Sequence, residues 1–336
     1  MTLPHMHIYC LRLPLPPRQP RPAREAAVTL PAAVSSSLLG RREDQDMAEL
    51  TDFEQQRDRL WAVAYRITGS VADADDAVQE TWLRWQALPA DEVADPRAYL
   101  TTVISRICYD LLGSARVRRE AYVGPWLPEP VVAAGGPEDR VTLDESVGLA
   151  LLTVLERLTP AERTAFILHD VFSVPFPEIA EVVGRSPDSV RQLASRARKR
   201  VREEAPRRSV DRAEHRRAVD AFLQAVLGGG MEGLLEILDP EVVWRSDGGG
   251  KVAAARVPVV GNEKVARFAQ GLARGFDPAT MVVHRCAVND APGLVIADRT
   301  GDQAVVFAFS VHQGLITEID VVVNPDKLRH LDLPNL

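Results

Sequence analysis

The most informative stretch of this chain reads Phe176-Pro-Glu-Ile-Ala-Glu-Val-Val-Gly-Arg-Ser-Pro-Asp-Ser-Val-Arg-Gln-Leu-Ala-Ser-Arg-Ala-Arg-Lys-Arg-Val201. Its apolar residues follow helical spacing in two sets, Ile179, Ala180 and Val183, then Val190, Leu193, Ala197 and Val201. Between the sets, Gly184 allows a tight turn, and Ser186-Pro187 places an N-cap residue before a proline at the first helical position. A short helix, a glycine turn and a second helix are typical of a helix-turn-helix.

The exposed face of the second helix is polar and basic. We expect it to contact DNA through Ser186, Ser189, Arg191, Gln192, Ser195, Arg196 and Lys199. Reading the major groove requires Arg, Gln or Ser near the start of a helix, with Lys or Arg further on to hold phosphates. Residues 185–208 contain nine basic and three acidic residues, although the net charge of the chain is −7. A solvated basic helix end in an all-α bundle is the alternative interpretation.

Residues 47–119 predict three helices upstream of this motif. The first ends near Gly69 and places Phe53, Leu60, Ala64 and Ile67 on one face. The second begins in the acidic run Asp73 to Asp76, which favours the helix dipole, and continues to Pro89. The third begins at Asp95-Pro96 and carries the apolar stripe Leu100, Val103, Ile104, Ile107 and Leu111.

Two segments differ in composition from these helices. Residues 1–46 hold seven prolines, which block helices and sheets, so we expect a disordered extension. A further hypothesis places the start of translation at Met47. Residues 120–146 hold six acidic residues, one arginine and several Pro and Gly, so we expect an acidic linker rather than a helix. Helix resumes over residues 147–205, with Thr159 as an N-cap and Pro160 at the first position.

Cysteine usage and hydropathy exclude other classes of protein. The three cysteines, Cys10, Cys108 and Cys286, lie far apart, which excludes a disulfide scaffold and a Cys-ligated zinc site and fits a reducing cytoplasm. No apolar run approaches the ~20 residues needed to cross a bilayer. We therefore expect a cytoplasmic protein with no membrane contact, no metal site and no cofactor.

The pattern changes over residues 207–331. Helices are predicted over 211–227, over a segment with Leu234, Leu235 and Leu238 that Asp239-Pro240 closes, and over Glu263 to Arg274. A short strand is predicted at Val242–Trp244, and four more strands at Met281–Val288, Gly293–Asp298, Ala304–Val311 and Leu315–Val323. Helices followed by an antiparallel meander indicate an α+β domain.

The helical half resembles a known family. Asp73-Ala-Asp-Asp-Ala-Val-Gln-Glu-Thr-Trp-Leu-Arg-Trp85 is similar to the polymerase-binding helix in region 2 of extracytoplasmic-function sigma factors of bacterial RNA polymerase. Pro96-Arg-Ala-Tyr-Leu100, running into Ile107 and Arg119, resembles the helix that melts and reads the −10 promoter element. Leu158-Thr-Pro-Ala-Glu-Arg163 and the helix-turn-helix resemble region 4, which reads the −35 element. The resemblance implies core RNA polymerase and promoter DNA as partners.

This resemblance assigns roles in region 2. It implies a polymerase contact through Asp76, Gln79, Glu80 and Trp82, and a −10 contact through Arg97, Arg106, Tyr109, Arg116, Arg118 and Arg119. Single-strand binding combines such charges with aromatic stacking, for which Tyr99 and Tyr109 are candidates. Core packing is the alternative role of Trp82, Trp85 and both tyrosines.

Three further motifs resemble the subgroup that carries a SnoaL-like C-terminal domain, a curved sheet wrapped around helices. They are Tyr122-Val-Gly-Pro-Trp-Leu-Pro-Glu-Pro130, Asp247-Gly-Gly-Gly-Lys251 and Asn324-Pro-Asp-Lys-Leu328. The resemblance implies that this domain regulates the sigma core within the same chain. We expect an intramolecular contact through Trp126, Asp247, Gly248, Gly249, Gly250, Lys251, Asn324, Pro325, Asp326 and Lys327, because three glycines let a backbone approach another surface closely. The alternative interpretation of the Asn324 motif is that it only caps the C-terminal end of the domain. The sequence also leaves open whether the domain's pocket binds a small ligand.

Two other functions are alternatives for parts of this sequence. SnoaL-like domains include isomerases and polyketide cyclases with a pocket Asp or His, for which Asp247, His284, Asp298 and His312 are candidates. No second acid or base stands at a spacing that forces a pair into one pocket, so we expect no enzyme. A stand-alone helix-turn-helix regulator with a ligand-sensing domain explains residues 176–201 but gives the acidic and Arg-rich helices of region 2 no role.

Overall fold

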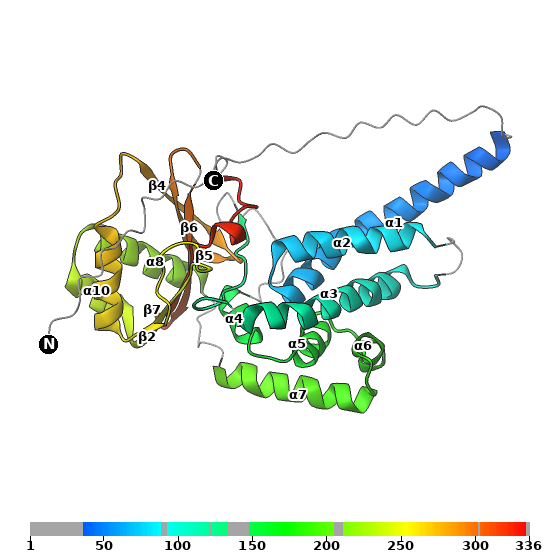
Figure 1. Ribbon diagram of the computed structural model, residues 1–336, viewed down its shortest axis with the longest axis horizontal. Helices are drawn as coiled ribbons and strands as arrows, with labels where there is room; N and C mark the ends of the chain where they lie inside the picture. The colour runs from blue at the N-terminus through cyan, green and yellow to red at the C-terminus, as the bar shows by residue number, and fades with distance from the viewer. Residues whose placement is uncertain are drawn as a thin grey trace.

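The computed structural model describes residues 36–88, 93–120, 122–133, 148–204, 211–301 and 303–333. The side chains of residues 36–51 and 115–120 lie outside this description, as do residues 1–35 and residues 134–147 of the predicted acidic linker. The described chain forms a helical half and a C-terminal domain built on a sheet (Figure 1). The predicted multi-domain fold, two all-α domains followed by an α+β domain, is confirmed.

Three helices form the first helical domain, α1 (Ser36–Thr68), α2 (Val71–Gln86) and α3 (Pro96–Glu120). Ser70 accepts a hydrogen bond from the Asp73 amide at the start of α2, and Asp95 accepts one from the Ala98 amide at the start of α3. The expectation of disorder over residues 1–46 is wrong for residues 36–46, because α1 begins at Ser36, ahead of the predicted helical region 47–119.

The second helical domain contains α4 (Leu149–Leu155), α5 (Pro160–Phe166), the π-helical turn η1 (Ile167–Val171), α6 (Phe176–Val183) and α7 (Pro187–Glu204). Thr159 and Glu162 form a capping box at the start of α5, as the N-cap prediction requires. Gly184 ends α6 with φ of 64°, a left-handed conformation that favours glycine. Helices α6 and α7 are the predicted helix-turn-helix.

The two helical domains share one apolar core. Buried residues from both contribute to it, including Leu60 and Ile104 from the first domain and Leu152, Ile167 and Ile179 from the second. Between them, Arg59 and Arg66 of α1 lie 5.7 and 5.2 Å from the ring centre of Phe172, which follows η1. The two domains therefore pack directly on each other.

The C-terminal domain contains α8 (Arg212–Leu227), α9 (Met231–Ile237), α10 (Asn262–Ala273) and a sheet of seven strands among the described residues. The strands are β1 (Val132–Ala133), β2 (Leu238–Asp247), β3 (Val259–Val260), β4 (Met281–Val288), β5 (Ala291–Asp298), β6 (Ala304–His312) and β7 (Leu315–Val322). Their order is β1-β4-β5-β6-β7-β2-β3, and a short 3-10 turn, η2 (Pro325–Lys327), follows β7.

Two details of this domain differ from the sequence prediction. Leu238 was expected in a helix and begins strand β2 instead, which extends far beyond the predicted Val242–Trp244. The strands β4 to β7 form the predicted antiparallel meander, but β2 pairs with β7 in parallel, so the sheet is mixed.

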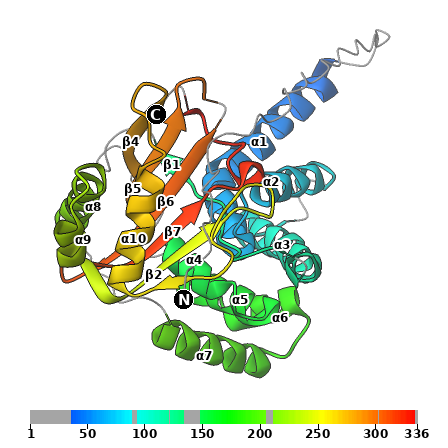
Figure 2. The ribbon, with the colours of Figure 1, turned by 60° about the vertical axis from the view of Figure 1, so that its left-hand side comes forward.

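The sheet lies between helices α8–α10 and the helical half (Figure 2). Trp244 and Phe309 on one face pack with Phe222 of α8 and Val265 of α10. The other face packs Val295, Val306 and Val322 against Leu127 of the linker and Leu149 of α4. Strand β1 comes from the linker, so the linker is built into the sheet. In the part of the chain that the structure describes, no helix is both long and apolar enough to cross a membrane.

Candidate functional site

Helix α7 presents its polar side chains away from the core. Val190, Leu193, Ala194 and Ala197 are buried, whereas Arg191, Gln192, Ser195, Arg196 and Lys199 are exposed and Ser189 is half-buried. The Ser186 hydroxyl accepts a hydrogen bond from the Ser189 amide, which caps the helix. Arg191 pairs with Asp188 and lies 5.5 Å from the ring centre of Phe176. The predicted DNA-contacting residues thus share one solvent-facing surface.

Helix α3 carries the predicted −10 contacts. Arg97 and Arg106 are exposed, whereas Tyr109 is half-buried against the core. Arg116, Arg118 and Arg119 belong to α3, with side chains outside the described part. The ring of Tyr99 lies 6.0 Å from that of Trp85, so one of its sides packs against α2.

Helix α2 carries the predicted polymerase contact. Asp76, Gln79 and Glu80 are exposed on one side of the helix. Trp82 is half-buried and packs on Phe53 with ring centres 4.8 Å apart, so it takes part in the core. Sequence reasoning missed Leu83, whose side chain is 54% exposed beside these polar residues. The sequence could have indicated Leu83, because it is an apolar residue that lies outside the core-facing stripe of this helix.

The predicted interdomain residues meet around the carboxylate of Asp247. This residue ends β2 and is fully buried. Its carboxylate accepts hydrogen bonds from the Leu127 amide at 2.8 Å and from the Tyr122 hydroxyl, both in the linker. The Lys327 ammonium lies 2.7 Å from the same carboxylate. We call Tyr122, Trp126, Leu127, Asp247 and Lys327 the linker clamp.

Lys327 and Asn324 complete this arrangement from the segment after β7. The Lys327 ammonium donates to the Leu127 carbonyl and lies 3.2 Å from the ring centre of Trp126, where it makes a cation–π contact. Asn324 donates to the Tyr122 hydroxyl at 2.8 Å. Burial and the Asp247 carboxylate raise the pKa of Tyr122, so its phenol stays protonated and donates.

The remaining motif residues surround the linker clamp. Gly249 has φ of 60°, and a Cβ there would stand 2.3 Å from the Asn324 amide nitrogen. A Cβ on Gly248 would stand 2.7 Å from the Val252 carbonyl oxygen, and one on Gly250 would stand 3.2 Å from Cβ of Val123 in the linker. Lys251 pairs with Asp326 at the surface, and Pro325 begins η2. Gly249 and Gly250 therefore allow the loop to lie close to Asn324 and to Val123 of the linker.

The other side of the linker binds the first helical domain. The Glu129 carboxylate accepts hydrogen bonds from the Val71 amide at 2.7 Å and the Ser70 hydroxyl at 3.0 Å, so it caps α2. The Tyr65 hydroxyl donates to the Glu129 carbonyl at 2.6 Å and accepts from the Asn289 amide at 2.6 Å. Sequence reasoning missed these residues because each acts on a segment far away in the chain.

Two of the candidates for enzyme chemistry, Asp247 and Asp298, are engaged in separate places. Asp247 is engaged by the linker, and Asp298 accepts hydrogen bonds from Thr300 and Gln303 in its own turn. The interior between the sheet and α10 is packed with aromatic rings. Trp244 meets Phe268 and Phe307 edge to face at 5.3 and 6.0 Å.

Comparisons with known proteins agree with this architecture. Family models match "Sigma-70 region 2" at residues 53–118, "Sigma-70, region 4" at 148–201 and "SnoaL-like domain" at 219–319. The ECF RNA polymerase sigma factor SigJ of Mycobacterium tuberculosis is 42% identical over 290 residues, 83% of this chain and 93% of SigJ. A probable ECF sigma factor of the same species, SigI, is 38% identical over 79% of this chain and 90% of SigI.

The fold is shared as well. The crystal structure of M. tuberculosis SigJ superposes with a TM-score of 0.69 at 39% identity, covering 84% of this chain and 99% of that structure. The agreement extends over both helical domains and the C-terminal domain. The chain therefore belongs to the ECF RNA polymerase sigma factors, as a member with a SnoaL-like C-terminal domain.

Proposed function

We propose that this sigma factor directs RNA polymerase to promoters by reading the −35 element with α7 and the −10 element with α3, and that its C-terminal domain regulates this reading by holding the linker. As a sigma factor it acts with core polymerase in the cytoplasm. The exposed basic face of α7 supports the first role. The engagement of Asp247 by the linker favours a regulatory role for the C-terminal domain over an enzymatic one.

The linker clamp is the observation that carries the regulatory part. Residues 122–133 are bound on one side by Asp247 and Lys327 and on the other by the first turn of α2 through Glu129. A linker bound on both sides ties the first helical domain to the C-terminal domain, against which Leu149 of the second helical domain also packs, so it holds the two DNA-reading domains close to each other.

The distance between these two domains is short in this arrangement. Arg106 of α3 lies 3.9 Å from the Glu181 carboxylate of α6, so the two domains touch. The −10 and −35 elements are about 25 base pairs apart, roughly 85 Å at about 3.4 Å per base pair. The domains must separate to read both elements together, and the linker clamp opposes that separation.

Run-off transcription with purified core polymerase tests this proposal, on the promoter upstream of the protein's own gene. Trp126→Leu removes the cation–π contact while keeping an apolar side chain, and we expect more transcript from the same start site at limiting polymerase. Lys264→Met, on the exposed face of α10, removes a cation outside the linker clamp and should leave transcription unchanged.

Equal transcript from Trp126→Leu and the wild type would refute regulation by the linker clamp. An absence of polymerase-dependent initiation with all proteins would instead refute the assigned promoter. Alanine at Arg191 and Gln192 should abolish initiation at the wild-type promoter, which tests the role of α7 separately.

A further inference from the structure

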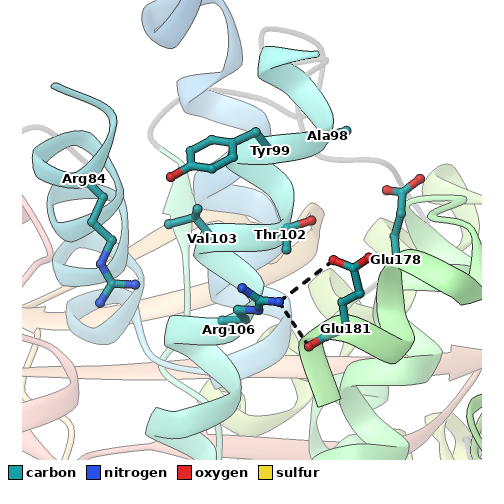
Figure 3. A pocket seen from close by; sticks show the side chains of 8 residues that line it. All are labelled: Arg84, Ala98, Tyr99, Thr102, Val103, Arg106, Glu178 and Glu181. Carbon is teal, nitrogen blue, oxygen red and sulfur yellow. Dashed lines mark hydrogen bonds and ion pairs between the residues drawn. The ribbon is translucent and has the colours of Figure 1, made fainter. Parts of the chain in front are cut away.

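A groove runs along the exposed face of α3, between α2 and α6 (Figure 3). Its volume is about 560 Å³, within the usual range of about 300–1,000 Å³ for ligand-binding clefts. Ala98, Tyr99, Thr102, Val103 and Arg106 of α3 line it. Arg84 of α2 stands on one side, and Glu178 and Glu181 of α6 stand on the other. The groove thus lies between the two helical domains.

The α2 and α3 sides of the groove have the chemistry of a single-strand binding site. Such sites combine cations that follow the backbone with an aromatic ring on which a base stacks. Arg84 and Arg106 supply two guanidinium groups, on side chains that are 49% and 52% exposed. Arg84 also pairs with Glu80 of its own helix at 3.1 Å, an exposed and therefore weak pair that a phosphate can displace. Tyr99 is half-buried, with Trp85 supporting it from α2. Arg84 was not among the residues that the sequence assigned to DNA.

The α6 side of the groove has the opposite charge. Arg106 donates to the Glu181 carbonyl at 3.4 Å and lies 3.9 Å from the Glu181 carboxylate, while Glu178 stands one turn away along α6. In a helix-turn-helix on DNA, the first helix crosses the phosphate backbone, where carboxylates are repelled. Glu178 and Glu181 therefore have no favourable role toward DNA, whereas Glu181 contacts a cation of α3 and Glu178 lines the same groove.

We propose that, while the two helical domains are packed together, Glu178 and Glu181 of α6 occupy this groove in place of the phosphates that Arg84 and Arg106 would hold on a melted strand stacked on Tyr99, so that the second helical domain itself blocks the groove. The inference rests on the proposed role of α3 in binding the melted strand. The Arg106–Glu181 pair is exposed, and exposed pairs are weak, so DNA can displace it.

The test measures binding of the full chain, without polymerase, to a fluorescein-labelled thymidine oligomer of about 12 nucleotides, a length within usual single-strand site sizes. Fluorescence anisotropy at about 50 mM salt keeps phosphate contacts strong. The double variant Glu178→Gln and Glu181→Gln should bind about two- to fivefold more tightly, the factor expected when a weak ion-pair competitor is lost. Arg106→Ala and Arg84→Ala should each weaken binding.

A matched control separates this mechanism from a general charge effect. Glu232→Gln with Glu236→Gln changes the charge equally, on the exposed face of α9 in the C-terminal domain, and should leave binding unchanged. A double-mutant cycle adds a second control, because Glu181→Gln should have no effect once Arg106 is alanine. Tyr99→Phe should keep the affinity and Tyr99→Leu should lose at least about fivefold, as expected for stacking.

Two results would overturn the inference. One is a gain in affinity of the Glu178 and Glu181 double variant that is no larger than that of the α9 control, or that persists when Arg106 is also replaced by alanine. The other is unchanged binding in both arginine variants. If run-off transcription still depends on α7 in that case, the inference about the groove is wrong while the proposed sigma-factor function stands.

Discussion

The ammonium of Lys327 lies 2.7 Å from the carboxylate of Asp247, and the two side chains are 4% and 0% exposed. A buried ion pair costs desolvation for both charges, so it persists only with further hydrogen bonds. Asp247 has them from Tyr122 and Leu127, and Lys327 from the Leu127 carbonyl and the ring of Trp126. The end of β2, the segment after β7 and the linker therefore stabilise one another through this ion pair.

Lys327→Met should be strongly destabilising. It leaves a buried carboxylate without its cation, and breaking such a pair costs about 3–5 kcal/mol. Chemical denaturation followed by circular dichroism measures the free energy of unfolding. Lys251→Met breaks the exposed pair with Asp326 and should cost at most about 1 kcal/mol. Similar losses in both variants would contradict the buried pair.

Gly249→Ala should destabilise the loop after β2. Alanine at φ of 60° is strained by about 1–2 kcal/mol, and its Cβ would stand 2.3 Å from the Asn324 amide. Gly230→Ala is the control, because its Cβ meets nothing within 4 Å and its φ is −79°. Thermal unfolding of the two variants compares them, and a Tm for Gly249→Ala as high as that of the control would count against this contact.

Gln192 and Lys199 should contribute differently to promoter binding. Gln192 lies near the start of α7, so Gln192→Ala should cost about 1–3 kcal/mol at one base pair and relax specificity there. Lys199 lies further along, so Lys199→Ala should weaken binding to all sequences and reduce the salt slope by about 1. Holoenzyme binding to a set of −35 variants, at several salt concentrations, separates the two effects.

Asp320 should make stability depend on pH. It lies in β7, 3% exposed, and shares Arg245 with Glu318, and burial raises the pKa of Asp320 to about 6. The folded state then holds this proton more tightly than the unfolded state, whose pKa is near 3.8. This group's contribution should therefore fall, by at most about 3 kcal/mol, as pH rises from about 4 to about 6. The Asp320→Asn variant should lose this pH dependence. A difference in the free energy of unfolding between variant and wild type that is the same at pH ~4 and pH ~7 would refute the prediction.

The structural features that could be predicted from the sequence are those set by residues close together in the chain. The capping residues Ser186 and Thr159, the turn at Gly184 and the strand Met281–Val288 follow from spacing and residue type alone. Leu238 was placed wrongly because an apolar residue after a helical run fits either element, and pairing with β7 decides between them.

The contacts between distant segments had no such signature. All three motifs, including the one at residues 122–130 of the linker, are identified by resemblance, but the pairing of Tyr122 and Leu127 with Asp247 depends on how the linker crosses the sheet. Asn289 and Tyr65 are separated by 224 residues, so their hydrogen bond could not be read from either neighbourhood. Long-range polar contacts of this kind require the assembled fold.

Strand β1 has a consequence for solubility. Val132 and Ala133 pair with Val288 and Ala287 and cover the outer edge of β4. An uncovered sheet edge is a template for pairing with another chain. If the proposed separation also withdraws the linker from the sheet, that edge and the apolar face under Leu127 would become exposed together. On the proposed mechanism, the separated form would therefore be prone to self-association until it binds polymerase.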